Sequence, residues 1–189
     1  MADNILVPLD GSELADAALP YAEAIAKALG WGIVLLRVVS GDPARHPRPG
    51  SAPIEAPLEE ETARRPGYNL FQAEEAGAID ALAPAVARLR AAGLTADSEV
   101  GVGDAKTVIA ERAGEQDIAV VVMASHGRTG LRRVFRGSVA SAVVDHSARP
   151  VVIVRPFRDE QARVDLEHAE RLPSEHVDAL RRAVDQLAT

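Results

Sequence analysis

Glycine and serine residues gather after an apolar run in a pattern that suits binding of a phosphate group. The run Ile118–Met123 is typical of a buried strand. The loop and helix start that follow it hold Gly127, Gly130, Gly137 and Ser138. Because glycine has no Cβ, its backbone N–H can approach an anion closely, and the first turn of a helix presents further unpaired N–H groups. A strand, a glycine-rich loop and a helix start therefore predict a phosphate cradle.

Of the four arginines in this loop, only one is a candidate ligand for phosphate. Arg128 is expected to bind phosphate, because a guanidinium can donate two parallel hydrogen bonds to it. The other three arginines of the loop are expected to be solvated: Arg132, Arg133 and Arg136. His126 is a candidate general base, but without a carboxylate partner a loop histidine is the more common reading. A ligand-free alternative also stays open, in which Gly127 and Gly130 only shape turns.

Asp10 is the second candidate, because it directly follows the apolar run at residues 4–9. Asp10-Gly11-Ser12 is either a binding loop or a simple turn in which Ser12 caps the next helix. Other phosphate and nucleophile motifs are absent, since neither GxxxxGK[ST] nor GxSxG occurs. The pair Gly101 and Gly103 lacks the third glycine of a dinucleotide fingerprint.

Five apolar runs that alternate with helical patterns position these loops. The expected strands are residues 4–9, 33–39, 95–102, 118–123 and 150–154. The expected helices lie between Ser12 and Gly30, between Ile79 and Gly93, after Asp104, and from Ser138 to His146. Pro20 and Pro84 interrupt the first two helical patterns, which predicts a kink or a later start in each. In the second helix the predicted apolar positions are Ile79, Leu82, Ala83, Val86 and Leu89.

This alternation predicts an α/β fold, a doubly wound open parallel five-stranded sheet with helices on both faces. The strand order 3-2-1-4-5 of Rossmann-like mononucleotide-binding folds would reverse between the first and fourth strands. Ligands of such sheets bind outside the carboxyl ends of the strands at the reversal. The order therefore brings Asp10 and the 124–130 loop together.

Four segments resemble the universal stress protein family, over about residues 3–156. They read VPLDGSELADAALPYA, VGVGDAKTVIAERA, VVMASHGRTGLRRVFRGSVA and VVDHSARPVVIV. The family's ATP-binding pattern is Gly, two residues, Gly, nine residues, Gly, then Ser or Thr. Gly127 and Gly137-Ser138 match it, whereas the first glycine is Ala124 here. The Ala124 methyl group is expected to weaken tight binding of a triphosphate.

The resemblance implies ATP as ligand, with AMP or ADP as alternatives, and Mg²⁺ or Mn²⁺ beside the phosphates. It implies that Pro8 and Leu9 line the adenine slot, that the Val38 backbone reads the adenine edge, and that Asp10 accepts hydrogen bonds from the ribose. The remaining implied site residues lie around the phosphates: Ala124, Ser125, His126, Gly127, Arg128, Gly130, Gly137, Ser138 and Val139. No catalytic residue and no protein metal ligand is implied.

Composition limits the other function classes. The net charge of −7 argues against sequence-independent binding of nucleic acid. No apolar run approaches the roughly 20 residues of a membrane span, and the N-terminus lacks the basic start of a signal peptide. The cytoplasm is therefore the expected location. The absence of cysteine excludes a disulfide framework.

Residues 1–156 are expected to form the nucleotide-binding domain, and residues 157–189 a helical extension with an amphipathic stripe. Residues 41–66 hold six of the twelve prolines and are expected to form a mobile inserted loop.

Three functions follow from the resemblance. The first is a nucleotide-dependent regulatory protein in the stress response, a homodimer through residues 150–154, with an unidentified regulatory protein partner. The second is a slow ATPase or nucleotide hydrolase at the same site, which lacks an evident general base. The third is a dimeric interaction module that has lost its nucleotide.

Overall fold

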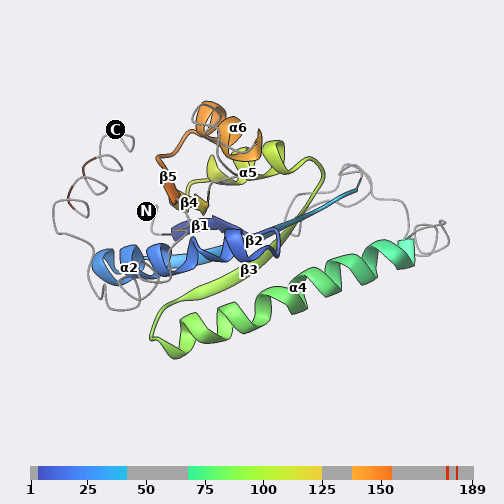
Figure 1. The fold of residues 1–189 in the computed structure, drawn as a ribbon, viewed down its shortest axis with the longest axis horizontal. Coiled ribbons are helices and arrows are strands. Elements are labelled where there is room, and N and C mark those ends of the chain that lie inside the picture. Colours follow the sequence, from blue (N-terminus) through green and yellow to red (C-terminus); the bar gives the residue numbers. More distant parts are fainter. Residues whose placement is uncertain (1–3, 42–67, 125–137, 155–177, 179–181, 183–189) are drawn as a thin grey trace, which may run out of the picture.

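A five-stranded parallel sheet forms the centre of the molecule (Figure 1). The computed structural model describes residues 4–41, 68–124, 138–154, 178 and 182. Its strands are β1 (Asn4–Pro8), β2 (Gly32–Val39), β3 (Ala96–Val102), β4 (Ile118–Ala124) and β5 (Val151–Val154). They lie in the order β3-β2-β1-β4-β5, which confirms the predicted order and fold class.

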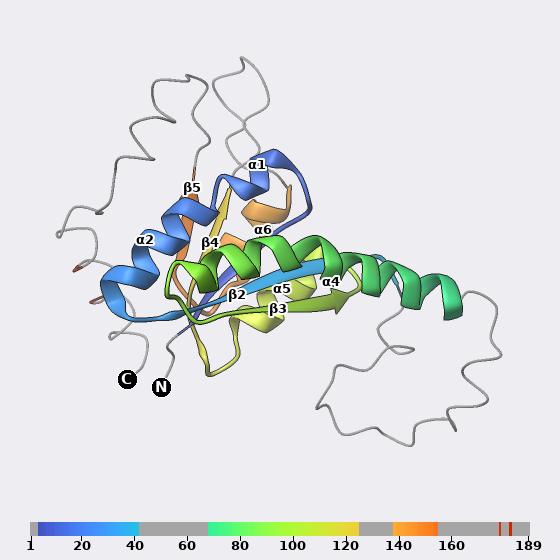
Figure 2. The ribbon, with the colours of Figure 1, turned by 90° about the horizontal axis from the view of Figure 1, so that it is seen from below.

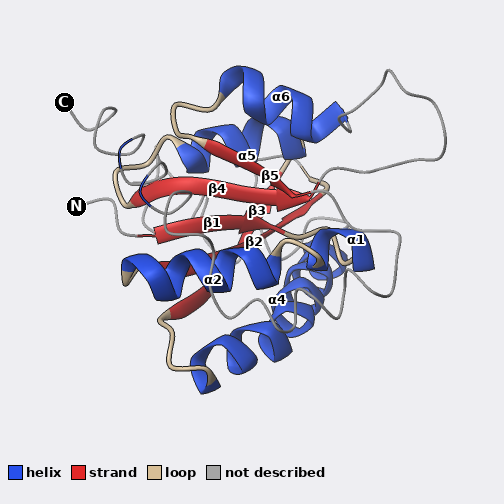
Figure 3. Cartoon of the chain, turned by 60° about the vertical axis from the view of Figure 1, so that its left-hand side comes forward, coloured by secondary structure: helices blue, strands red, loops and turns tan. Residues whose placement is uncertain are grey.

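Helices cover both faces of the sheet (Figures 2 and 3). They are α1 (Glu13–Asp16), α2 (Leu19–Leu29), α4 (Tyr68–Ala91), α5 (Ala105–Ala113) and α6 (Ser138–His146). Helices α2 and α4 pack on one face in one apolar cluster, and α5 and α6 pack on the other in a second cluster. Every residue of β4 is buried, as expected of a central parallel strand with both faces covered.

Pro20 divides the first helical pattern into two helices, which confirms the later start predicted for its regular part. The Ser12 hydroxyl accepts a hydrogen bond from the Ala15 N–H and so caps α1. Pro20 lies in the first turn of α2, where its missing N–H would have no helical partner. Gly30 ends α2 with φ +72°, a left-handed conformation that favours glycine.

Pro84 does not delay the second helical pattern, so the predicted later start is wrong. Helix α4 begins at Tyr68 and continues through Pro84 to Ala91. Pro84 and Asp80 are both exposed, so the Asp80 carbonyl that loses its donor remains accessible to water. The buried positions of α4 are Ala78, Leu82, Val86 and Leu89, whereas Ile79 and Ala83, which we expected to be apolar contacts, are exposed.

Arg112, whose side chain is 8% exposed, connects the middle of β3 with the amino end of β4. Its Nε donates to Glu99 at 2.7 Å and its Nη1 donates to Asp117 at 2.8 Å. Asp117 also lies 3.4 Å from the Asn4 amide nitrogen. Hydrogen bonds from the Arg112 guanidinium hold the pKa of Asp117 below its ordinary value. One side chain of α5 thus connects β3 with the residue that precedes β4.

The lowered pKa of Asp117 predicts acid sensitivity of the fold. A carboxyl group whose pKa is lower in the folded state contributes stability above its unfolded pKa, and this contribution is lost as the pH falls through the folded value. We expect the free energy of unfolding, measured by urea titration, to decrease below about pH 4. Asp117→Asn should make this decrease shallower, and Asp97→Asn, a change at an exposed carboxylate, should not. Equal slopes in the two variants would contradict the assignment.

Three predicted segments lie outside the described residues: the 41–66 loop apart from residue 41, the glycine-rich loop at 125–137, and the extension at 157–189 apart from residues 178 and 182. Among the helices that the structure describes, none is long and apolar enough to cross a membrane.

Candidate functional site

The crevice of the sheet opens between β1 and β4 at their carboxyl ends. The two strands pair only as far as Leu6 and Val121. Leu36 on β2 bonds to the Leu9 N–H, so along β1 the backbone groups of Leu9 and Val7 face β2 and those of Pro8 face β4. The N–H that Pro8 lacks therefore falls on the side where pairing with β4 has already ended. This explains how a proline is accommodated in the central strand of the sheet.

Near the end of β2, the backbone groups of Val38 face the side where β1 has already ended. The Leu9 N–H donates to the Leu36 carbonyl at 2.8 Å, which is the last bond between β1 and β2. On the other side of β2, the Val39 carbonyl accepts from the Gly103 N–H at 3.0 Å. Since successive residues of a strand direct their backbone groups to opposite sides, the N–H and carbonyl of Val38 face the space beyond Leu9.

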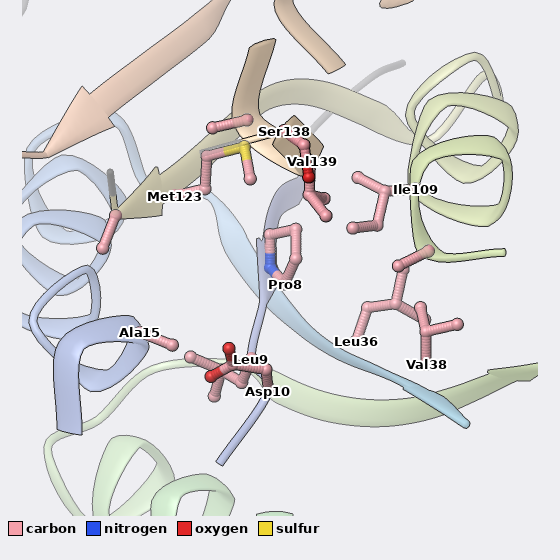
Figure 4. A pocket seen from close by; sticks show the side chains of 13 residues that line it. Pro8, Leu9, Asp10, Ala15, Leu36, Val38, Ile109, Met123, Ser138 and Val139 are labelled. Carbon is pink, nitrogen blue, oxygen red and sulfur yellow. The ribbon is translucent and has the colours of Figure 1, made fainter. Parts of the chain in front are cut away.

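A pocket of about 460 Å³ occupies this space (Figure 4). Its volume lies in the range typical of small-molecule sites. The described residues that line it are Pro8, Leu9, Asp10, Ala15, Leu36, Val38, Ala105, Ile109, Met123, Ala124, Ser138, Val139 and Ala140. In Figure 4, Leu36, Val38 and Ile109 gather on one side of Pro8, and Met123, Ser138 and Val139 gather on another. The wall is therefore mostly apolar.

Two polar side chains, Asp10 and Ser138, interrupt the apolar wall among the described lining residues. Asp10 is exposed at the rim, and its Oδ1 accepts a hydrogen bond from the Ser12 N–H at 2.9 Å. This bond closes a turn around Gly11, whose φ is +79°. Ser138 is the first residue of α6, so the first backbone N–H groups of that helix lie at the pocket.

Seven of the thirteen site residues named from the sequence line this pocket. They are Pro8, Leu9, Asp10, Val38, Ala124, Ser138 and Val139. The other six lie outside the described residues: Ser125, His126, Gly127, Arg128, Gly130 and Gly137. The topology therefore brings Asp10 to one crevice with Ala124 and Ser138, the described residues on either side of the glycine-rich loop.

Six lining residues were missed by the sequence interpretation: Ala15, Leu36, Ala105, Ile109, Met123 and Ala140. Two signals could have found three of them. Leu36 lies two residues before Val38, and the two share a face of the strand. Ala105 and Ile109 are four residues apart on one face of α5.

The glycines at 101 and 103 serve packing and turning. A Cβ at Gly101 would collide with Val108 of α5, so glycine lets α5 lie close to β3. Gly103 has φ +126° and begins the turn into α5, whose cap is Asp104. The resulting position of α5 brings Ala105 and Ile109 to the pocket.

No group of three or more His, Cys, Asp or Glu side chains that could hold a metal ion occurs within the described ranges. The pocket itself contributes one carboxylate, Asp10, and one hydroxyl, Ser138, from these ranges. Mg²⁺ is commonly bound by one or two carboxylates together with the phosphates of a substrate. This donor set fits a divalent cation only when a ligand supplies most of the oxygens.

Comparison with known proteins identifies relatives along most of the chain. The model of the universal stress protein family matches residues 1–155. The sequence is 25% identical over 160 residues to universal stress protein MJ0577 of Methanocaldococcus jannaschii, covering 82% of this chain and 96% of that protein. A solved structure of MJ0577 superposes with a TM-score of 0.62 at 24% identity, covering 84% of this chain and 99% of that one.

Two solved structures with the same fold were determined with adenine nucleotides. A universal stress protein in complex with cAMP superposes with a TM-score of 0.52 at 21% identity, covering 80% of this chain and 95% of that one. The universal stress protein of Archaeoglobus fulgidus in complex with dAMP also gives 0.52, at 20% identity, covering 81% and 98% of the two chains.

Proposed function

Because the chain belongs to the universal stress protein family, we propose that its pocket binds an adenine nucleotide and that the protein acts as a nucleotide-dependent regulator. The observation that carries this proposal is the position of the pocket, at the carboxyl ends of β1 and β4 where the strand order reverses. Two universal stress proteins of this fold, solved with cAMP and dAMP, support the choice of an adenine nucleotide.

The apolar side of the pocket suits the adenine ring. Leu36, Val38 and Ile109 supply aliphatic surface on which a flat ring can lie. The N–H and carbonyl of Val38, which face the space beyond the end of β1, offer a donor and an acceptor to the edge of the ring. Adenine carries both kinds of group on its edge.

The polar rim suits the ribose and phosphates. A carboxylate accepts hydrogen bonds, so Asp10 would bind the ribose hydroxyls. The start of α6 favours anions because the N-terminus of a helix carries partial positive charge. We assign the phosphates to Ser138 and Val139 together with the glycine-rich loop, and Mg²⁺ or Mn²⁺ to the phosphate oxygens.

Ala124 influences which nucleotide is preferred. It is 9% exposed and lines the pocket in place of the first glycine of the family pattern. Its methyl group reduces the room for a close backbone contact with phosphate, so we expect ATP to bind less tightly than to a protein with glycine there. The affinity for AMP, which needs fewer phosphate contacts, should be reduced less.

The function is tested by identifying the nucleotide that the protein carries. Mass spectrometry of the supernatant from purified, acid-denatured protein should detect ATP, ADP or AMP. Calorimetric titration of nucleotide-free protein should then give saturable binding of adenine nucleotides and weaker binding of GTP. Absence of binding would overturn the proposal and favour an interaction module without nucleotide. Formation of ADP from added ATP over hours would show that the protein also hydrolyses ATP slowly.

Asp10→Ala should weaken binding by removing the ribose contact. A hydrogen bond to a charged group contributes about 1.5–3 kcal/mol, so the Kd for ATP should rise about 10- to 100-fold. The Kd for 2′,3′-dideoxy-ATP, which lacks both hydroxyls, should barely change. Asp16→Ala, at an exposed carboxylate of α1 outside the pocket lining, is the matched control. An equal loss for both nucleotides would contradict a ribose role.

We also propose a homodimer through β5. This strand lies at one end of the strand order and pairs only with β4 among the described strands. Three of its four residues are half-buried rather than buried. An edge strand presents unpaired backbone groups that a second copy could bind. Light scattering should give twice the chain mass, and Ile153→Lys should give the monomer mass; an unchanged dimer would place the interface elsewhere.

A further inference from the structure

Arg37 is a charged residue in an apolar strand, and it lies on the opposite face of the sheet from Val38. Successive side chains of a strand alternate between faces. Ile33 and Leu35 belong to the apolar cluster of α2 and α4, so Arg37 extends from that face near the end of β2. It is half-buried, and the described residues include no carboxylate that pairs with it. Within the described part of the chain, neither the adenine slot nor an ion pair therefore explains its charge.

The guanidinium of Arg37 lies directly against Gly11. A Cβ placed on Gly11 would lie 3.3 Å from Arg37 Cζ and 3.3 Å from Nη2, and closer still to Nη1. The space that any other side chain would fill at Gly11 is therefore occupied by the planar end of Arg37. The φ of Gly11 is +79°, a backbone conformation that favours glycine, and the absence of a Cβ there lets the Arg37 guanidinium approach the turn.

The turn that Arg37 contacts is the turn that carries Asp10. The Asp10 Oδ1 accepts from the Ser12 N–H across Gly11, so the carboxylate and the turn are held as one unit. All three residues of the turn are exposed or half-buried, and a glycine turn without outside support has considerable backbone freedom. Arg37 contacts this turn from the face of the sheet that α2 and α4 cover, and of Arg37, Gly11 and Asp10 only Asp10 lines the pocket.

We propose that Arg37 is a positioning residue, which packs against Gly11 and thereby holds the Asp10 carboxylate at the ribose position of the pocket. The inference rests on the proposed nucleotide function. Arg37 acts through the turn and does not touch the ligand. Its loss should therefore affect the ribose contact selectively, because Leu36 and Val38 of the adenine slot extend from the opposite face of β2 and Ile109 belongs to α5.

The experiment compares the binding of ATP with that of 2′,3′-dideoxy-ATP to the full chain. The unaltered protein should prefer ATP about tenfold or more. In Arg37→Ala this preference should fall below about threefold, while the Kd for 2′,3′-dideoxy-ATP stays within about twofold. Arg37→Met, which keeps an unbranched apolar stem without the planar end, should behave like Arg37→Ala. Arg88→Ala, at a half-exposed arginine of α4, should retain the full preference.

The outcomes separate the two proposals. An unaltered protein that binds neither nucleotide would overturn the proposed function and this inference together. An unaltered protein that prefers ATP, with the same preference in Arg37→Met, would overturn the positioning role alone. An equal loss of affinity for both nucleotides would also overturn it, because a general disturbance of the fold would have that effect. Loss of the ribose preference at an unchanged melting temperature would support it.

Discussion

Val38→Trp is expected to abolish nucleotide binding while leaving the fold intact. The Val38 side chain lines the apolar side of the pocket, and an indole there would fill the space proposed for adenine. Tryptophan is well tolerated in strands, and Val38 is half-buried near the end of β2, so the sheet can accept it. We expect the Kd for ATP, measured by calorimetry, to rise at least about 100-fold, a loss of about 2.7 kcal/mol.

Val39→Trp is the matched control for this change. Val39 is the next residue of β2, has the same side chain and is also half-buried, but it extends from the opposite face and does not line the pocket. Its Kd for ATP should remain within about threefold of the unaltered protein. If Val38→Trp bound ATP normally and had a melting temperature like that of Val39→Trp, adenine would not bind in this pocket.

Of the substitutions proposed for this protein, Arg112→Met is expected to lower the free energy of unfolding the most. The change leaves Glu99 and Asp117 beside the interior without the cation that hydrogen-bonds both. Removing one partner of a buried ion pair costs about 3–5 kcal/mol, but these carboxylates are 40% and 46% exposed, so we expect about 2–3 kcal/mol. For a chain of this size the melting temperature should fall by about 5–10 °C.

Arg88→Met provides the comparison, because it removes an arginine that is 52% exposed and lies 3.5 Å from Glu23. Exposed pairs of this kind contribute about 0–1 kcal/mol, so its melting temperature should change by at most about 3 °C. Similar shifts in the two variants would show that the connection of α5 with the middle of β3 and the amino end of β4 is weak. Nucleotide affinity should be retained in both, because neither arginine lines the pocket.

The sheet and its strand order could be predicted because their signals are local. Each strand is a short apolar run, and Ser12, Gly30 and Asp104 mark helix ends by their own chemistry. Once the order was assumed, the reversal between the first and fourth strands was enough to bring Asp10 and Ser138 to one pocket. Local patterns and one topological rule were sufficient for this part.

The remaining features depend on contacts between residues far apart in the chain. Helix α4 continues through Pro84 because Asp80 and Pro84 both face solvent, and the proline alone does not reveal which side of the helix is covered. For the same reason Ile79 and Ala83 were expected on the buried face, which instead begins at Ala78 and continues through the predicted Leu82, Val86 and Leu89. Arg112 and Arg37 gain their roles only when β3 and the β1–α1 turn are in place.

The proline in the central strand also has a kinetic consequence. Since Pro8 has no N–H on the side of β4, β1 cannot donate the next hydrogen bond of the ladder to β4, which disfavours closer pairing of the two strands at the pocket. The pocket should therefore already be open before the nucleotide binds. In stopped-flow mixing, the observed association rate should rise linearly with ligand concentration, without the plateau that a slow opening step would impose.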